Sequence, residues 1–271
     1  MHPTSEKMLI AVANNLPQSL LLFGNNGVGL STISKYIAKL RKVKPLIILP
    51  EKDEKIDLEK GIINVDIMRR LYNETRTKTA NERIIIIDYT ERMTQQAQNA
   101  FLKLLEEPGD NVYFILVSHS KSKLLPTIIS RVEILNIKPI TLNQSNELLD
   151  SLSITDKTKR SQLLFMAEGL PAEINRLHNN EDYFKERSLM IRDARDLLRG
   201  SLYQKLLIAQ RYKDNRASVL TILLDVANIL KKSIISNPQT DTISYIDKIL
   251  DTYKLIEANG NIRLCLARMV I

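Results

Sequence analysis

The chain has 271 residues, of which 44% are hydrophobic and 26% are charged, and it carries a formal net charge of +8. No apolar run approaches the roughly 20 residues that a membrane-spanning helix needs, and the first residues do not resemble a secretory signal. Cys265 is the only cysteine, which excludes a disulfide within the chain. We therefore expect a cytoplasmic protein with no membrane partner. Its basic charge suits either a DNA partner or ordinary solvated lysine faces.

The first apolar run, residues 19–23, leads into a loop that follows the phosphate-binding pattern G-x-x-x-x-G-K-[ST] except at one position. The residues that match it or flank the match are Gly24, Gly27, Gly29, Ser31 and Thr32. Leu30 stands where the lysine that neutralises the phosphates belongs. A helical pattern follows, so strand, loop and helix occur in the order that the motif requires. A glycine turn without a ligand is the alternative, and we predict a degenerate nucleotide site that is weak or empty.

Apolar runs without alternation recur through the first half of the chain, and they predict strands covered on both faces. These runs are residues 20–23, 46–49, 62–65, 84–87, 112–117 and 132–137. Helical stretches separate several of them, which favours an α/β fold with a parallel sheet and right-handed crossovers. Ligands of such sheets bind at the carboxyl ends of the strands, where the glycine loop falls.

The run 84–87 ends in Asp88, which is how a Walker B carboxylate is presented to magnesium. Tyr89 follows at the position where active oligomeric ATPases usually carry a glutamate that polarises water. Asp88 would also suit a helix cap or a turn, but the glycine loop upstream favours the nucleotide site.

Residues 94–108 predict an amphipathic helix that stops at Pro108. From residue 138 onward the pattern is helical throughout, with a break at Gly169-Leu170-Pro171 and another at Asn237-Pro238. The predicted helices cover residues 143–152, 156–167, 171–179, 183–212, 216–235, 242–258 and 260–270.

Two sequence motifs resemble signatures of the AAA+ clamp-loader family of the DNA polymerase III holoenzyme. They are N-A-F-L-K-L-L-E-E-P at residues 99–108 and the dipeptide Ser130-Arg131. Among the members of that family, the chain is most similar to the subunit that acts as a stator. Val132 replaces the usual cysteine of the family's S-R-C motif. By motif the resemblance covers residues from about 8 to 180. It implies three parts: an AAA+ P-loop sheet domain over residues 1–138, a helical lid over 139–180 and a helical collar over 181–271.

The resemblance also gives Arg131, next to Ser130, the role of an arginine finger that enters the nucleotide site of a neighbouring subunit. The planar, permanently charged guanidinium suits contact with a γ-phosphate. The alternative is that Arg131 simply pairs with a nearby carboxylate.

Three departures from active relatives fit a subunit that does not hydrolyse ATP. They are Leu30, Tyr89, and Ala172 at the position of a second-sensor arginine. Ser118 falls near the first-sensor position, but a serine at the end of a strand is common and does not by itself indicate a sensor. The implied function is a stator in the loading of a sliding clamp onto primed DNA. The rival is an active AAA+ NTPase such as the motor subunit, and a third possibility is a DNA-binding or signalling protein on the same scaffold.

The expected partners are other clamp-loader subunits, both ATPase and delta-like, in a pentameric ring, together with the sliding clamp and, indirectly, primed DNA. No cofactor is expected, because ATP would be bound by neighbouring subunits. Many family members carry a four-cysteine zinc module, but residues 41–82 contain neither cysteine nor histidine, which excludes that site. The histidines His2, His119 and His178 show no ligand spacing and are expected to be ordinary polar side chains.

Overall fold

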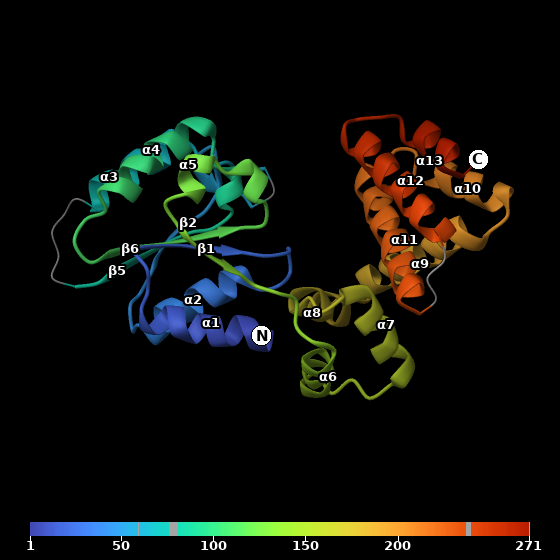
Figure 1. Cartoon of the computed structure of the whole chain (residues 1–271), viewed down its shortest axis with the longest axis horizontal. Helices are drawn as coiled ribbons and strands as arrows, with labels where there is room; N and C mark the ends of the chain where they lie inside the picture. The colour runs from blue at the N-terminus through green and yellow to red at the C-terminus, as the bar shows by residue number, and fades with distance from the viewer. Residues whose placement is uncertain (59, 76–80, 237–239, 271) are drawn as a thin grey trace. The chain divides into compact units, whose positions relative to one another are not determined.

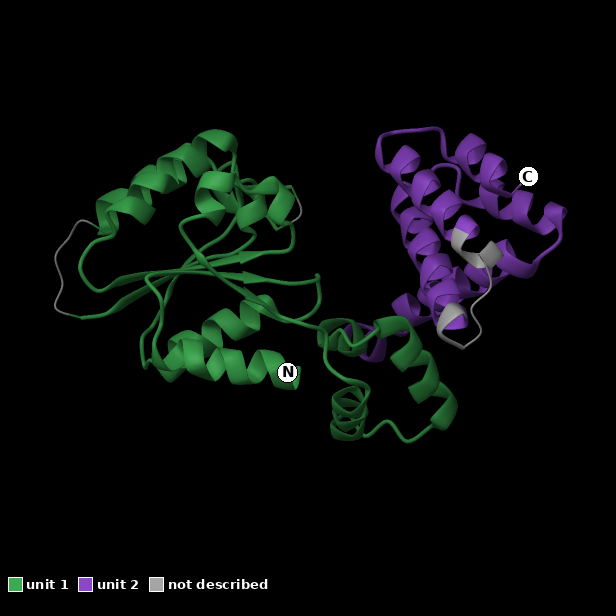
Figure 2. Ribbon diagram, viewed as in Figure 1, with its two compact units in different colours: residues 1–175 green, residues 176–271 purple. Residues whose placement is uncertain are grey.

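The computed structural model describes residues 1–58, 60–75, 81–236 and 240–270. The chain divides into two compact units, residues 1–175 and residues 176–271, which Figure 2 colours separately. The division falls within helix α8 (Pro171–Asn179). The domain boundaries predicted at residues 138 and 180 stay predictions.

A five-stranded sheet in the order β2-β5-β6-β1-β7 forms the centre of the first unit. Its strands are β1 (Ser19–Phe23), β2 (Leu46–Ile48), β5 (Arg83–Ile87), β6 (Val112–Ser118) and β7 (Glu133–Asn136). All neighbouring strands of this sheet run parallel, so their carboxyl ends meet at one edge. The strands β1, β5 and β6 are buried along almost their whole length, which is why their sequences are apolar without alternation. The predicted parallel α/β sheet is confirmed.

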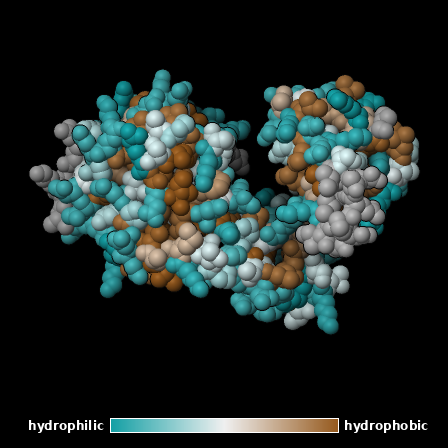
Figure 3. All heavy atoms as spheres, in the orientation of Figure 1, coloured by the Kyte–Doolittle hydropathy of each residue, from teal (hydrophilic) through white to brown (hydrophobic). Residues whose placement is uncertain are grey.

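Helices cover both faces of this sheet (Figure 1). One layer contains α1 (Pro3–Asn14) and α2 (Leu30–Leu40), and the other contains α3 (Val65–Thr75), α4 (Gln95–Glu106) and α5 (Pro126–Ile129). Each layer closes its own hydrophobic core against the sheet. In the core between the sheet and the layer of α3, α4 and α5, the rings of Phe101 and Phe114 meet edge to face with centroids 5.3 Å apart. On the face drawn in Figure 3, hydrophobic residues form a band across this unit between hydrophilic side chains.

Shorter elements complete the first unit. They are the antiparallel hairpin of β3 (Glu51–Lys52) and β4 (Lys55–Ile56), the 3-10 helices η1 (Thr90–Arg92) and η2 (Lys121–Lys123), and the helices α6 (Leu142–Ser151) and α7 (Lys157–Ala167). The helix α1 was not among the segments that the sequence pattern predicted.

Two predictions about individual elements are wrong. The run 62–65 is not a strand of the sheet: Ile63 makes only an isolated bridge to Met93, and α3 begins at Val65. The side chain of Asn64 accepts hydrogen bonds from two backbone N–H groups of the first turn and so starts the helix. The single helix predicted over residues 183–212 is two helices.

The second unit contains α9 (Glu181–Arg199), α10 (Leu202–Arg211), α11 (Arg216–Ser236), α12 (Thr240–Glu257) and α13 (Ile262–Val270). The break between α9 and α10 lies at Gly200, after which Ser201 and Gln204 form a capping box. These helices share one hydrophobic core. The predicted break at Asn237-Pro238 lies outside the described residues. Among the helices that could be searched, none is long and apolar enough to cross a membrane.

Candidate functional site: a degenerate phosphate-binding loop

The glycine loop joins β1 to α2 at the carboxyl edge of the sheet. Gly27 and Gly29 have φ angles of 89° and 96°, a region of backbone conformation that favours glycine. Gly24 is required for a different reason, because a Cβ there would lie 2.6 Å from the carbonyl oxygen of Ile137. Each glycine of the motif is therefore explained by backbone conformation or by close packing. That the loop binds phosphate through its backbone stays a prediction.

Leu30 is the first residue of α2, and its side chain is buried with only 1% of its surface exposed. It belongs to the hydrophobic core between the α1 and α2 layer and the sheet, together with Val28 and Ile33, and Leu170 packs against the same core. The position that supplies a phosphate-binding lysine in active P-loop proteins is thus part of the apolar interior.

Two side chains of the predicted nucleotide site, Ser31 and Asp88, contact each other directly. The Ser31 hydroxyl donates a hydrogen bond of 2.6 Å to Asp88 Oδ2, and the backbone N–H of Tyr89 donates one of 2.9 Å to Asp88 Oδ1. Asp88 is buried, whereas Thr32 is exposed on the first turn of α2. A hydroxyl and a carboxylate are the oxygen ligands that Mg²⁺ takes in P-loop proteins, so the magnesium side of the site retains suitable donors. Among the described residues, no group of three or more His, Cys, Asp or Glu side chains is placed to hold a metal ion.

Residues at the start of α8 also contact the loop. The backbone N–H of Ala172 donates a hydrogen bond of 3.1 Å to the carbonyl oxygen of Gly27. Leu170 lies close by, 3.5 Å from the point where a Cβ on Gly27 would stand. The residue at the second-sensor position therefore contacts the loop through its backbone, and its methyl side chain brings no charge to a phosphate.

His119 is a residue of this site that sequence reasoning did not identify. Its Nδ1 lies 3.0 Å from the carbonyl oxygen of Gly24, and because a carbonyl only accepts, Nδ1 carries the proton. Strand register explains the contact, since Phe23 is paired with Ser118 and the residues that follow them are neighbours. Ser118 itself is fully buried, and its hydroxyl donates to the carbonyl oxygen of Ser120 in the same loop.

Tyr89, which stands in place of the water-polarising glutamate, has a left-handed backbone with a φ angle of 55°. The Arg92 guanidinium lies over its ring at 5.2 Å, and the His119 ring contacts it edge to face with centroids 6.2 Å apart. A phenol in this aromatic and cationic setting lacks the negative charge with which a carboxylate orients an attacking water. Leu30 and Tyr89 therefore stand where active P-loop ATPases carry the phosphate-binding lysine and the water-polarising glutamate.

The predicted finger residue lies on the turn that follows α5. Arg131 Nη2 donates to Glu106 Oε1 at 2.8 Å, and Arg131 Nη1 donates to the carbonyl oxygen of Thr127 at 3.1 Å. The Ser130 hydroxyl donates to the same Thr127 oxygen at 3.1 Å. The Arg131 side chain remains 39% exposed. In the single chain it pairs with a carboxylate, as the simpler alternative supposed, and its role as a finger stays a prediction.

The sequence matches a family model and several subunits of DNA polymerase III. A family described as "DNA polymerase III, delta subunit" matches residues 42–141. The delta-prime subunit of DNA polymerase III from Haemophilus influenzae is 35% identical over 112 residues, which is 40% of this chain and 34% of that protein. The gamma subunit from Buchnera aphidicola is 25% identical over 237 residues, covering 78% of this chain and 60% of that protein. The matches thus span less than two thirds of either relative.

Among solved structures, a gamma-subunit-related protein of DNA polymerase III from Thermotoga maritima aligns with a TM-score of 0.50 at 18% identity. The alignment covers 98% of this chain and 97% of that one, and at this identity it shows the fold alone.

The parallel five-stranded sheet, with the glycine loop and Asp88 at its carboxyl edge and helices after it, confirms the predicted α/β fold class with a helical C-terminal part. These matches show a likeness to the AAA+ clamp-loader family over part of the chain. Within that family, the chain matches delta-prime subunits of DNA polymerase III at 29% to 35% identity.

Proposed function

We propose that this chain is a delta-prime-like subunit of a DNA polymerase III clamp loader that does not hydrolyse ATP itself. The burial of Leu30 is the observation that carries the proposal, because the loop position that holds a phosphate-binding lysine in active P-loop proteins is here a leucine buried in the hydrophobic core. One hydrogen bond to a charged group is worth about 1.5–3 kcal/mol, so its loss weakens nucleotide binding by about 10- to 150-fold.

The other side of the loop supports the same conclusion. The Gly27 carbonyl oxygen is hydrogen bonded to the lid segment through Ala172, and Leu170 lies close to Gly27. Tyr89 supplies no carboxylate for water activation. Any Mg-ATP that bound would meet neither the lysine, nor the glutamate, nor the second-sensor arginine. We infer that the degenerate site binds nucleotide weakly or not at all, and that the chain needs no cofactor of its own.

In this proposal Arg131 acts in trans, at the nucleotide site of a neighbouring ATPase subunit. Its exposure and its place at the end of a short, well-packed turn support this role, since Ile128 of the same turn is fully buried. A guanidinium has several N–H donors, and the contacts to Glu106 and Thr127 use only part of them. Donors therefore remain for phosphate oxygens.

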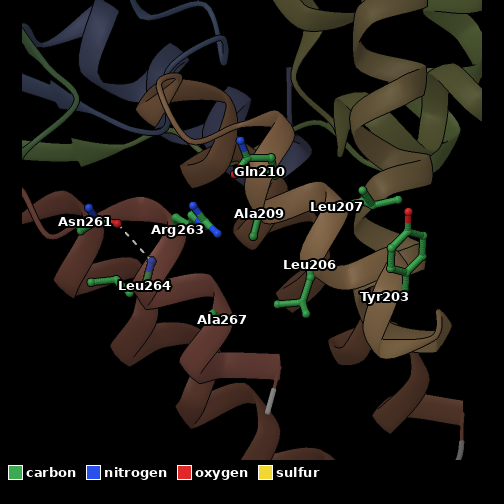
Figure 4. Close-up of a pocket in the computed structure, with 9 residues that line it drawn as sticks. All are labelled: Tyr203, Leu206, Leu207, Ala209, Gln210, Asn261, Arg263, Leu264 and Ala267. Carbon is green, nitrogen blue, oxygen red and sulfur yellow. Dashed lines mark hydrogen bonds between the residues drawn. The ribbon is translucent and has the colours of Figure 1, made fainter.

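The second unit supplies the assembly surface in the proposed complex. A groove of about 810 Å³ lies between α10 and α13 (Figure 4). Its lining includes Tyr203, Leu206, Leu207, Leu264 and Ala267. Four of these side chains, Tyr203, Leu206, Leu207 and Leu264, are 39% to 72% exposed along the same groove, and contiguous exposed apolar side chains mark surfaces that bind other proteins. We propose that other clamp-loader subunits bind here, within the collar part predicted for residues 181–271.

The proposed complex is a pentameric ring in the cytoplasm that contains ATPase and delta-like subunits and loads a sliding clamp onto primed DNA. This chain acts as its stator, with the lid predicted over residues 139–180 held against the degenerate loop. The names of the matched relatives, subunits of DNA polymerase III and of replication factor C, support such partners.

The test mixes this chain with an ATP-binding clamp-loader subunit and measures DNA-stimulated ATP hydrolysis. We expect Arg131→Ala to slow the site that receives the finger by about 10³-fold, which is the lower end of the effect known for arginine fingers. Arg69→Ala is the matched control, because Arg69 is an exposed arginine of the same unit that also pairs with a carboxylate. An unchanged rate for Arg131→Ala would show that the finger assignment is wrong.

Two observations favour a second candidate, an ATP-binding motor subunit. The magnesium-side pair of Ser31 and Asp88 is intact, and the gamma subunit from Buchnera aphidicola matches over 78% of this chain. Binding of labelled ATP by the isolated chain separates the two candidates. Tight, magnesium-dependent binding with turnover would establish the motor and exclude the stator.

A further inference from the structure

The contact between Arg131 and Glu106 joins two elements that are far apart in the sequence and fixed in the fold. Glu106 is the last residue of α4, a helix anchored by the buried side chains of Phe101 and Leu104. Arg131 follows α5, which is anchored in the same core by Ile128. Neither backbone position is free to move without disturbing this core. The ion pair therefore connects two rigid points.

Two residues, Glu106 and Thr127, hold the Arg131 guanidinium. Glu106 Oε1 accepts from Nη2 at 2.8 Å, and the carbonyl oxygen of Thr127 accepts from Nη1 at 3.1 Å. An arginine side chain has many rotamers, and two contacts from different elements select one orientation of its planar fork. Since both partners are substantially exposed, with 39% and 52% of their side chains accessible, the contact contributes little to overall stability. Its main physical effect is on the orientation of Arg131.

We propose that Glu106 is the positioning residue for the finger, and that it fixes the Arg131 guanidinium before a neighbouring nucleotide arrives. The inference rests on the proposed function of Arg131. A finger that is already oriented loses less conformational freedom when it meets the phosphate, so more of its charge interaction appears in the transition state. A carboxylate accepting from one side of the fork leaves donors on the guanidinium for the phosphate.

The neighbouring residue Glu107 provides a matched control. It has the same side chain, is exposed, and lies one position beyond the end of α4. Substitution at Glu107 changes the local charge as much as substitution at Glu106 and leaves the contact to Arg131 in place. The experiment uses full-length chain assembled with ATP-binding clamp-loader subunits. It measures the kcat and KM of DNA-stimulated ATP hydrolysis, with melting temperatures to verify that each variant is folded.

We expect Glu106→Ala to lower kcat at the site that receives the finger by about three- to tenfold with KM for ATP unchanged, since only the orientation of the finger is lost. Glu106→Gln restores most of the rate, because its amide oxygen accepts the same hydrogen bond, and Glu107→Ala matches the wild type. The Glu106→Ala/Arg131→Ala double variant is no slower than Arg131→Ala alone, because Glu106 acts only through Arg131.

The outcomes distinguish this inference from the function on which it rests. If Arg131→Ala leaves the rate unchanged, the finger assignment fails and the inference fails with it. If Arg131→Ala slows the reaction but Glu106→Ala does not, the function stands and Glu106 has no positioning role. A faster Glu106→Ala variant would show that the pair restrains the finger, and additive losses in the double variant would show that Glu106 acts by another route. Either result overturns the inference alone.

Discussion

The replacement of Leu30 by lysine restores the phosphate-binding motif in sequence, and we expect that it will not restore the site. In the structure Leu30 is 1% exposed within the core between α2 and the sheet. The new ammonium group must either stay buried or swing out toward the loop. Burial of an uncompensated charge is the more costly outcome. The swing removes a leucine-sized side chain from the core, which leaves a cavity.

The magnitude follows from the less costly route. Leucine-to-alanine changes in buried positions cost about 2–5 kcal/mol, and the methylene groups of lysine fill part of the space, so we expect about 2–3 kcal/mol. The unit that contains this core has 175 residues. For a unit of this size each kcal/mol lowers the melting temperature by about 2–4 °C, so the expected decrease is about 4–12 °C. Leu30→Met is the control, since a volume-conserving swap costs less than about 1.5 kcal/mol.

The assay is thermal unfolding of the full chain, followed by circular dichroism, with and without excess Mg-ATP. We expect Leu30→Lys to melt well below Leu30→Met. Mg-ATP should leave both melting temperatures unchanged, because Ala172 still lacks the charge of a second-sensor arginine and the start of α8 still contacts the loop at Gly27. The reasoning is refuted if Leu30→Lys melts with the control. It is also refuted if Mg-ATP raises the melting temperature of Leu30→Lys, since a ligand that binds the folded state stabilises it.

Two further predictions concern the second unit. Asp225→Ala removes the carboxylate that pairs with the buried Arg187 guanidinium, so the free energy of unfolding measured in urea should fall by about 3–5 kcal/mol. Asp66→Ala, which breaks an exposed ion pair, is the control and should lower it by less than about 1 kcal/mol. Burial and the neighbouring Asp193 carboxylate raise the pKa of Tyr212 to about 12. The resulting stabilisation is therefore present below the unfolded pKa of about 10 and is lost as the pH rises through about 12. Ultraviolet titration of tyrosinate should lose its late step in Tyr212→Phe, and an unchanged titration curve would contradict the assignment.

The elements that were predicted correctly are those whose local pattern has one physical interpretation. The strands β1, β5 and β6 are buried on both faces, and in this context a continuous apolar run indicates a parallel strand. The same signal failed at residues 62–65, where a short apolar run is compatible with a helix start and the Asn64 cap decides. At Gly200 the helical pattern continues across the break, and only the capping box of Ser201 and Gln204 marks the new helix.

The sequence by itself determined the composition of the site. Loop glycines, the leucine in place of lysine and the aspartate at a strand end are local features, because each is set by residues adjacent in the chain. Only the tertiary structure decided what these residues contact. Three contacts join segments that are distant in the sequence: the hydrogen bond from Ala172 to Gly27, the one from His119 to the Gly24 carbonyl oxygen, and the ion pair of Arg131 with Glu106. Periodicity encodes which face of an element is buried, and it does not encode which partner that face meets.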